Sequence, residues 1–281
     1  MMKRKRHTAC GKKKMPVASC IILLVIVLGC VFADVICKKD PSYLDLMNYT
    51  KAPSAEFWFG TDTLGRDIFS CIWHGGRVSL LIGVASTALS TVIAIVYGAI
   101  SGIAGEKVDT LLMRFTEIIL SIPNLLLIIF LQAIMGKATI GSISIVIGLT
   151  SWFGIAKIIC TEVRQLRSSE YVIAAKCMGG SFWHILWKHL APNFVSSIMF
   201  MVVMNVRSAI VAESTLSFLG IGLPLDVISW GSMLSLAEKA LMSRAWWIVL
   251  IPGIFLVVVL MCITSLGHWL QVRVSHQEAK L

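Results

Sequence analysis

The sequence has few charged residues. Asp, Glu, Lys and Arg make up 14% of its 281 residues, whereas hydrophobic residues make up 57%. The mean hydropathy of +0.84 excludes an ordinary soluble domain and favours a polytopic membrane protein. Acidic residues are scarcer than basic ones, 15 against 25. Seven basic residues lie in the first 14 positions without aromatic residues between them, which favours a lipid-contacting membrane anchor over nucleic-acid binding.

The chain also lacks the motifs of common catalytic and metal centres. Its eight cysteines contain no C-x-x-C pair, its six histidines form no H-E-x-x-H motif, and no G-x-x-x-x-G-K-[ST] phosphate loop is present. Half of the cysteines lie in hydrophobic runs, and only Cys37 and Cys71 share a predicted external region where a disulfide could form. We therefore expect no catalytic centre, metal or cofactor on this chain, and no ATP hydrolysis by it.

Six hydrophobic segments are near or above the roughly 20 residues that a helix needs to cross a membrane. We expect these spans at 16–36, 78–103, 111–135, 140–160, 194–219 and 246–270. If the N-terminus is inside, the inner segments carry 16 Lys and Arg residues and the outer ones 8. The positive-inside rule therefore predicts that both termini are cytoplasmic.

The predicted organisation is a single all-α membrane domain with short tails. A basic tail precedes the first span, and an extracytoplasmic segment with an interfacial helix follows it. Five further spans form the core, which contains a cytoplasmic loop. The corresponding ranges are 1–15, 16–36, 37–77, 78–270 with the loop at 161–193, and a final tail at 271–281.

The longest polar interruption in the second half runs from Ser168 to Asn193. It predicts two short helices around an elbow. The first begins at Glu170 and ends at Gly179-Gly180, because glycine supplies the backbone angles of a C-cap. The second follows Ser181, a fair N-cap, and is predicted to end at Pro192.

Ala174 and Ala175 make one face of the first of these helices low enough for another protein surface to approach closely. We interpret the helix–elbow–helix as a docking element. The alternative is an interfacial helix pair that only joins two spans.

The segment before the second span reads FGTDTLGRDIFSCIWHGGRVSLLIG, from Phe59 to Gly83. Thr61 and Asp62 are predicted to cap a short helix, and Gly65 to make a turn. Arg66 with Asp67 is expected to keep a polar face toward water.

Four residues inside the spans are candidates for a pathway or a gate: Pro123, Arg207, Glu213 and Ser217. Pro123 is expected to bend the third span, because proline lacks an N–H. Arg207 and Glu213 are six residues apart on one helix, so they point about 120° away from each other and each needs another partner. We interpret Glu213 as part of a pathway or its gate. Arg207 could equally line a pathway or make a structural contact within the protein.

Several of these stretches resemble one family. Ala174, Ala175, Gly179 and Pro192 match the coupling motif of ABC importer permeases, although Ile173 stands where that motif has glutamate. The run Gly60-Thr61-Asp62, Leu64-Gly65-Arg66-Asp67 resembles the segment that precedes the second span in the branch importing dipeptides, oligopeptides and nickel. The stretches DTLLMRFTEIILSIP and ESTLSFLGIG resemble later spans of its shorter permease subunit.

The resemblance implies a type I ABC importer permease fold in the bacterial cytoplasmic membrane. It also implies a second permease subunit, two ATPase subunits that contact the elbow at Glu170, Gly180 and neighbouring residues, and an extracytoplasmic solute-binding protein. Di- or oligopeptides are the preferred cargo, and nickel or a metal chelate is the alternative. A secondary transporter or an intramembrane enzyme is less favoured, since we find no internal repeat, no row of intramembrane carboxylates and no catalytic pair.

Overall fold

The computed structural model describes residues 15–278 except 38, 238–239 and 241–243. In these residues the secondary structure is helical apart from one isolated β-bridge between Thr61 and Asp67. The α-helices are α1 (Val17–Val31), α2 (Ala33–Ile36), α3 (Ile68–Ile103), α4 (Glu106–Leu120), α5 (Asn124–Met135), α6 (Ile140–Thr150), α7 (Phe153–Leu166), α8 (Glu170–Cys177), α9 (Phe182–Ile185), α10 (Ala191–Phe218), α11 (Trp230–Leu234) and α13 (Trp247–Glu278). Leu46–Asn48 forms a 3₁₀ turn and Leu186–Leu190 a π-helical segment.

The expected all-helical class is confirmed, whereas the count of six spans stays a prediction. The helices α3, α10 and α13 are each long and apolar enough to cross a membrane. The pairs α4–α5 and α6–α7 also qualify if each is counted as one span across its bend of 89° or 43°. At 15 residues, α1 is shorter than the about 20 residues of a perpendicular crossing, so a sixth span at 16–36 stays a prediction.

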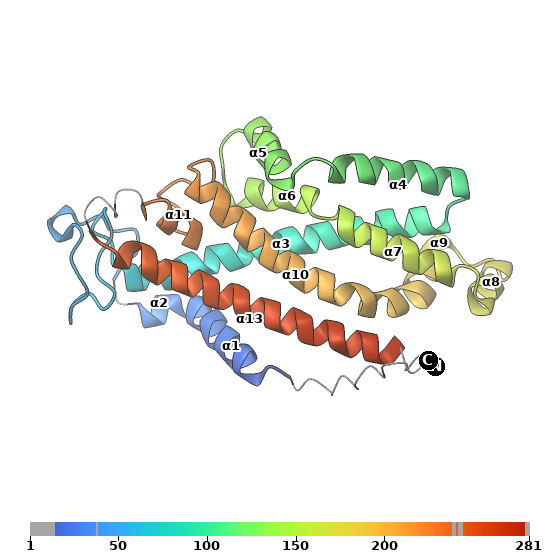
Figure 1. Cartoon of the computed structure of the whole chain (residues 1–281), viewed down its shortest axis with the longest axis horizontal. Helices are drawn as coiled ribbons and strands as arrows, with labels where there is room; N and C mark the ends of the chain where they lie inside the picture. The colour runs from blue at the N-terminus through green and yellow to red at the C-terminus, as the bar shows by residue number, and fades with distance from the viewer. Residues whose placement is uncertain (1–14, 38, 238–239, 241–243, 279–281) are drawn as a thin grey trace, which may run out of the picture.

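The helices run mostly along one direction and form a bundle with two distinct ends (Figure 1). We call the end with α8 and α9 the elbow end, and the end with α11 and the 39–67 loops the opposite end. At the centre, α3 packs against α6, α7 and α10, while α10 also packs against α13. The helix α1 lies against α13 and α3.

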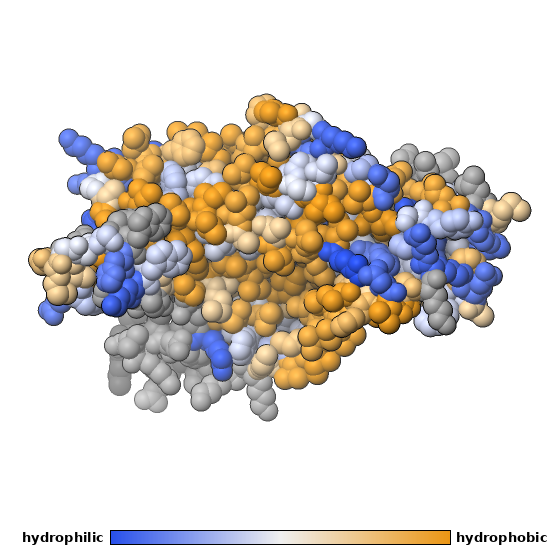
Figure 2. Space-filling model, turned by 180° about the vertical axis from the view of Figure 1, so that it is seen from behind, coloured by the Kyte–Doolittle hydropathy of each residue, from blue (hydrophilic) through white to orange (hydrophobic). Residues whose placement is uncertain are grey.

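The distribution of hydrophobic residues on the surface is that of a membrane protein. On the face shown in Figure 2, hydrophobic residues cover most of the middle of the bundle, whereas hydrophilic residues gather mainly at its two ends. Many large apolar side chains on the helices are exposed, among them Leu111, Phe130 and Met261. Such a broad apolar surface is suited to lipid or to partner helices rather than to water.

Side-chain caps fix where several helices begin. Asp67 accepts a hydrogen bond from the Ser70 backbone N–H at 3.0 Å and so starts α3 at Ile68. Instead of a separate interfacial helix, residues 68–77 therefore form the first part of α3. With 36 residues, α3 is about 54 Å long, which exceeds the hydrocarbon thickness.

Candidate functional site

An open cavity of about 440 Å³ lies about halfway along the bundle, where α4 ends and α5 begins, α6 ends and α7 begins, and α10 passes by (Figure 1). None of the described residues that line it is charged. Its polar side chains are Ser121, Asn124, Thr150, Ser151, Asn205 and Ser208. Pro123, the predicted cause of a bend, also lines it.

The two helix breaks explain why the cavity forms here. Pro123 stands between α4 and α5 and lacks the N–H that would continue the helix, so the expected bend is confirmed. The second break falls at Ser151 and Trp152. Irregular backbone within a membrane is tolerated where it lines a water-filled cavity or is covered by protein. The two breaks meet at this cavity.

Hydroxyl and amide groups share the lining of this cavity with apolar side chains such as Leu127 and Phe153. The hydroxyls of Ser121, Thr150 and Ser151 each donate to a carbonyl of the preceding turn, at 2.6, 3.0 and 2.7 Å. These bonds use the hydroxyl hydrogens and leave oxygen lone pairs as acceptors. The Asn205 amide is fixed by donation to Ser90 Oγ at 2.7 Å. The site can therefore hydrogen-bond a neutral polar group, such as a peptide backbone, without a charge of its own.

Glu213, two turns further along α10 than Asn205, has a different environment. Its side chain is fully buried. One carboxylate oxygen accepts from Ser229 at 2.7 Å and Ser217 at 3.0 Å, and the other accepts from Ser79 at 3.2 Å and Ser214 at 3.5 Å. The cluster joins α3, α10 and the start of α11. Glu213 and Ser217 thus hold helices together, and neither lines the central cavity; a gating role for them stays a prediction.

Arg207 faces a third environment. It lines a separate cavity of about 610 Å³ with residues of α13, including Met261, Ser265 and His268. Its Nε atom is buried and has no hydrogen-bond partner. The structure therefore does not bring Arg207 together with Glu213 or with Pro123, and the four sequence candidates lie in three different places.

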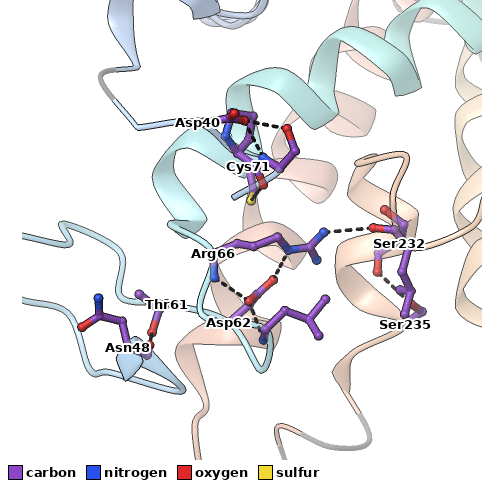
Figure 3. Close-up of polar contacts among 12 residues, drawn as sticks. Asp40, Asn48, Thr61, Asp62, Arg66, Cys71, Ser232 and Ser235 are labelled. Carbon is purple, nitrogen blue, oxygen red and sulfur yellow. Dashed lines mark hydrogen bonds and ion pairs between the residues drawn. The ribbon is translucent and has the colours of Figure 1, made fainter. Parts of the chain in front are cut away.

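The 59–67 segment folds into a closed clasp at the opposite end. Asp62 accepts from the Arg66 side chain at 2.7 Å and from the Arg66 backbone N–H at 2.9 Å, and the two side chains face each other in Figure 3. Arg66 also donates to the Leu225 carbonyl at 3.0 Å. The Thr61 carbonyl accepts from the Trp247 indole at 3.2 Å. The clasp thus ties the start of α3 to the loop after α10 and to α13.

This geometry corrects two predictions for the segment. Thr61 and Asp62 do not cap a helix; Asp67 does, as described above. Arg66 and Asp67 do not form a polar face toward water, because they are only 3% and 8% exposed. Their polar groups form hydrogen bonds within the chain instead. The predicted turn at Gly65 is confirmed, since Gly65 has φ of 75° and donates its N–H to the Asp62 carbonyl. Gly60, with φ of 77°, begins the clasp.

The first elbow helix, the glycine turn and the start of the second helix lie where the sequence predicts them. The helix α8 spans Glu170–Cys177, and Gly179 has φ of 79°, a left-handed angle that favours glycine. Ser181 accepts from the His184 backbone N–H at 3.3 Å, as an N-cap does. The chain therefore turns between the two helices at Gly179.

The two alanines of α8 have opposite surroundings. Ala174 is exposed, beside exposed Ile173 and near Met178, whereas Ala175 is only 5% exposed and belongs to the apolar core with Val172 and Leu186. The prediction that both alanines form one accessible face is wrong. Ile173, Ala174 and Met178 are accessible instead, as are Glu170 and Tyr171.

Pro192 does not end the second helix. Residues 182–218 are continuously helical, with the π segment Leu186–Leu190 directly before α10, and Pro192 lies in the first turn of α10. Proline cannot donate to the carbonyl four residues earlier and its ring clashes there, so a wider turn replaces the α pattern before it. The elbow thus continues into α10 without a loop.

Sequence reasoning missed most of the central cavity. It identified Pro123 but none of the six polar side chains around it. A signal was available in the sequence, since polar residues interrupt three spans at comparable depths. Single Ser, Thr and Asn residues are nevertheless common in membrane helices, where they bond to their own backbone, and this frequency masks the signal.

Comparison with known proteins identifies the class. Residues 94–276 match the family described as binding-protein-dependent transport system inner membrane component. That range contains both helix breaks, the elbow and all the polar side chains that line the central cavity.

Relatives agree over most of the chain. The oligopeptide transport system permease protein OppC of Bacillus subtilis is 37% identical over 254 residues, which cover 90% of this chain and 81% of that protein. The dipeptide transport system permease protein DppC of Bacillus subtilis is 35% identical over 260 residues, covering 92% and 81%. OppC of Haemophilus influenzae is 36% identical over 262 residues, covering 92% and 84%.

The fold and these matches define a multi-pass bacterial membrane protein of the permease class. The chain belongs to the family of binding-protein-dependent transport system inner membrane components.

Proposed function

We propose that this chain is a permease subunit of an ATP-driven importer of di- or oligopeptides, and that the central cavity forms part of the translocation pathway. The single observation that supports a peptide cargo is the 35–37% identity to permeases named for peptide transport. The cavity supports it, because a neutral lining of hydroxyls and amides suits the donors and acceptors of a peptide backbone.

A metal cargo fits the cavity less well. Transition-metal sites use imidazole, thiolate or carboxylate ligands, and the described lining has none of these groups. In the part of the chain that the structure describes, no group of three or more His, Cys, Asp or Glu side chains is placed to hold a metal ion. Peptide import is therefore preferred over import of nickel or a metal chelate.

The chain is proposed to act with partners. A second permease subunit would enclose the pathway, two ATPase subunits would supply the energy, and a solute-binding protein would deliver the peptide. The accessible α8 face of Ile173, Ala174 and Met178 is the proposed ATPase contact. Because the elbow continues into α10, movement at α8 reaches a helix that lines the cavity.

We propose six spans with the elbow end in the cytoplasm. Two methionines test this orientation: Met47 at the opposite end is 90% exposed, and Met178 at the elbow is 82% exposed. In a version without other cysteines, Met47→Cys should react with an impermeant thiol reagent in intact cells. Met178→Cys should react only after the membrane is opened. Reaction of Met178→Cys in intact cells would reverse the orientation.

Cargo is tested by uptake in cells that lack the native permease and carry this chain with its partner subunits. Labelled di- and tripeptides and radioactive nickel are supplied separately. We expect peptide uptake that depends on ATP and on the binding protein. Nickel uptake without peptide uptake would show that the cargo is nickel, while the chain would still be an importer permease. If a correctly assembled complex takes up neither, the cargo proposal as a whole is contradicted.

A further inference from the structure

The helix α4 is only lightly embedded in the bundle. Of its 15 residues, only Asp109 and Thr116 are buried. It nevertheless leads directly into the break at 121–123, which lines the central cavity. The contacts that hold α4 therefore determine where one wall of the cavity lies.

Asp109 makes the polar contacts that hold the first part of α4. Its carboxylate accepts from Ser101 Oγ of α3 at 2.7 Å and from Cys160 Sγ of α7 at 3.3 Å, and forms an ion pair with the Arg164 guanidinium. The Asp109 side chain is 11% exposed and the Arg164 side chain 50%. Further along, the Leu112 carbonyl accepts from Tyr97 Oη of α3 at 2.8 Å.

Arg164 and Arg167 lie at the end of α7, directly before the elbow. Arg167 donates to the carbonyls of Gly102 and Ala104 at 3.2 and 2.9 Å, which caps the C-terminal end of α3 with a cation. At Gly102, a Cβ would lie only 2.7 Å from Val163, so the two helices touch closely there. The helices α3 and α7 thus form one tightly packed unit, to which Asp109 attaches the first part of α4.

We propose that the Asp109–Arg164 pair transmits movement of the elbow to α4, and through α4 to the wall of the central cavity. These two residues are positioning residues for transport rather than groups that contact the cargo. The connection runs from α8 through the end of α7 to Asp109, and then along α4 to the break at 121–123. The inference rests on the proposed function, in which an ATPase moves the elbow.

The chain supplies a matched control on the same two helices. Glu117 of α4 pairs with Lys157 of α7 at 3.4 Å, and both side chains are more than 40% exposed. Exposed pairs contribute on the order of 0–1 kcal/mol, because water competes for the charges. Removing this pair should therefore leave the attachment of α4 unchanged.

The test uses the assembled complex in proteoliposomes with its binding protein, and measures peptide uptake and ATP hydrolysis together. Asp109→Asn and Arg164→Gln should each lower uptake per ATP hydrolysed at least about fivefold, the lower range of measured coupling between sites. The double variant should lose no more than either single one, because both remove the same contact. Glu117→Gln and Lys157→Gln should match the wild type.

A purely structural pair gives a different result: the amount of chain in the membrane, ATP hydrolysis and uptake would fall together, with their ratio unchanged. An unchanged ratio in both Asp109→Asn and Arg164→Gln overturns the proposal. A loss of the same size in Glu117→Gln also overturns it, because any disturbance of α4 would then suffice.

A second measurement does not depend on the cargo. Hydrogen exchange of backbone 119–127 is compared in the complex with and without ATP and vanadate. We expect a nucleotide-dependent change in the wild type that is absent in Asp109→Asn and present in Glu117→Gln. No change in the wild type, or an equal change in Asp109→Asn, contradicts the proposal. If the wild type imports no peptide, the cargo proposal fails while this comparison still decides the role of Asp109.

Discussion

Two polar regions on α10 lie about two turns apart and are built in opposite ways. At Glu213 a carboxyl group is fully buried, and four hydroxyls donate hydrogen bonds to it. At Asn205 and Ser208 the side chains are neutral and line an open cavity between two broken helices. Polar groups in a membrane protein need either partners or water. The closed cluster supplies partners and holds the fold together, whereas the open cavity is suited to a passing molecule.

The largest effect is expected from Glu213→Leu. The substitution leaves up to four buried hydroxyls without their acceptor, at a cost of about 1–3 kcal/mol for each that finds no other. We predict that little chain accumulates in the membrane, measured by immunoblot of the membrane fraction and by the melting temperature of the purified complex. Normal amounts of a chain that cannot transport would instead assign Glu213 to the pathway. Glu117→Leu, at a half-exposed carboxylate, is the control.

Filling the open cavity should separate function from stability. We predict that Ser208→Trp leaves the amount of chain near the wild-type level, because Ser208 is exposed to the cavity. The indole would project into the about 440 Å³ cavity and narrow it, so peptide uptake should fall toward the level of membranes without the chain. Val195→Trp, at an exposed position elsewhere on α10, is the control. Full uptake by Ser208→Trp would remove the cavity from the pathway.

The same contrast between closed and open surroundings appears in the elbow. Ala175 is buried, so Ala175→Trp should disrupt the core and lower the amount of chain. Ala174 is exposed, so Ala174→Trp should leave the amount unchanged and weaken co-purification of the ATPase subunit. Equal effects of the two substitutions on both measurements would show that the accessible face is not the contact.

The sequence predicted a region well where its structure depends on residues that are close together in the chain. The glycine turn of the elbow, the bend at Pro123 and the turn at Gly65 follow from a few neighbouring residues, and all three are where the sequence placed them. The surroundings of Glu213 and Arg66 depend on groups more than 130 residues away, such as the Ser79 hydroxyl and the Leu225 carbonyl. A single sequence does not reveal which distant groups meet, so both residues were assigned to more open positions than they have.

The smallest effect concerns the cap at the opposite end. Asp67→Ala removes the acceptor for the Ser70 N–H and hydroxyl at the start of α3. N-cap losses cost about 1 kcal/mol. We predict a slightly lower melting temperature and normal peptide uptake, with Asp67→Asn closer to the wild type. A loss of uptake at unchanged stability would instead give this clasp a direct part in transport.

The most direct test of the contrast on α10 compares two cysteines six residues apart. Ser208→Cys and Ser214→Cys are nearly isosteric, and are made separately in a version without other cysteines. The account predicts that a hydrophilic thiol reagent modifies Ser208→Cys in the assembled complex, and that peptide with its binding protein slows the modification. Ser214→Cys, within the closed cluster, should stay unmodified. Modification of Ser214→Cys that peptide slows, with no reaction of Ser208→Cys, would contradict the account.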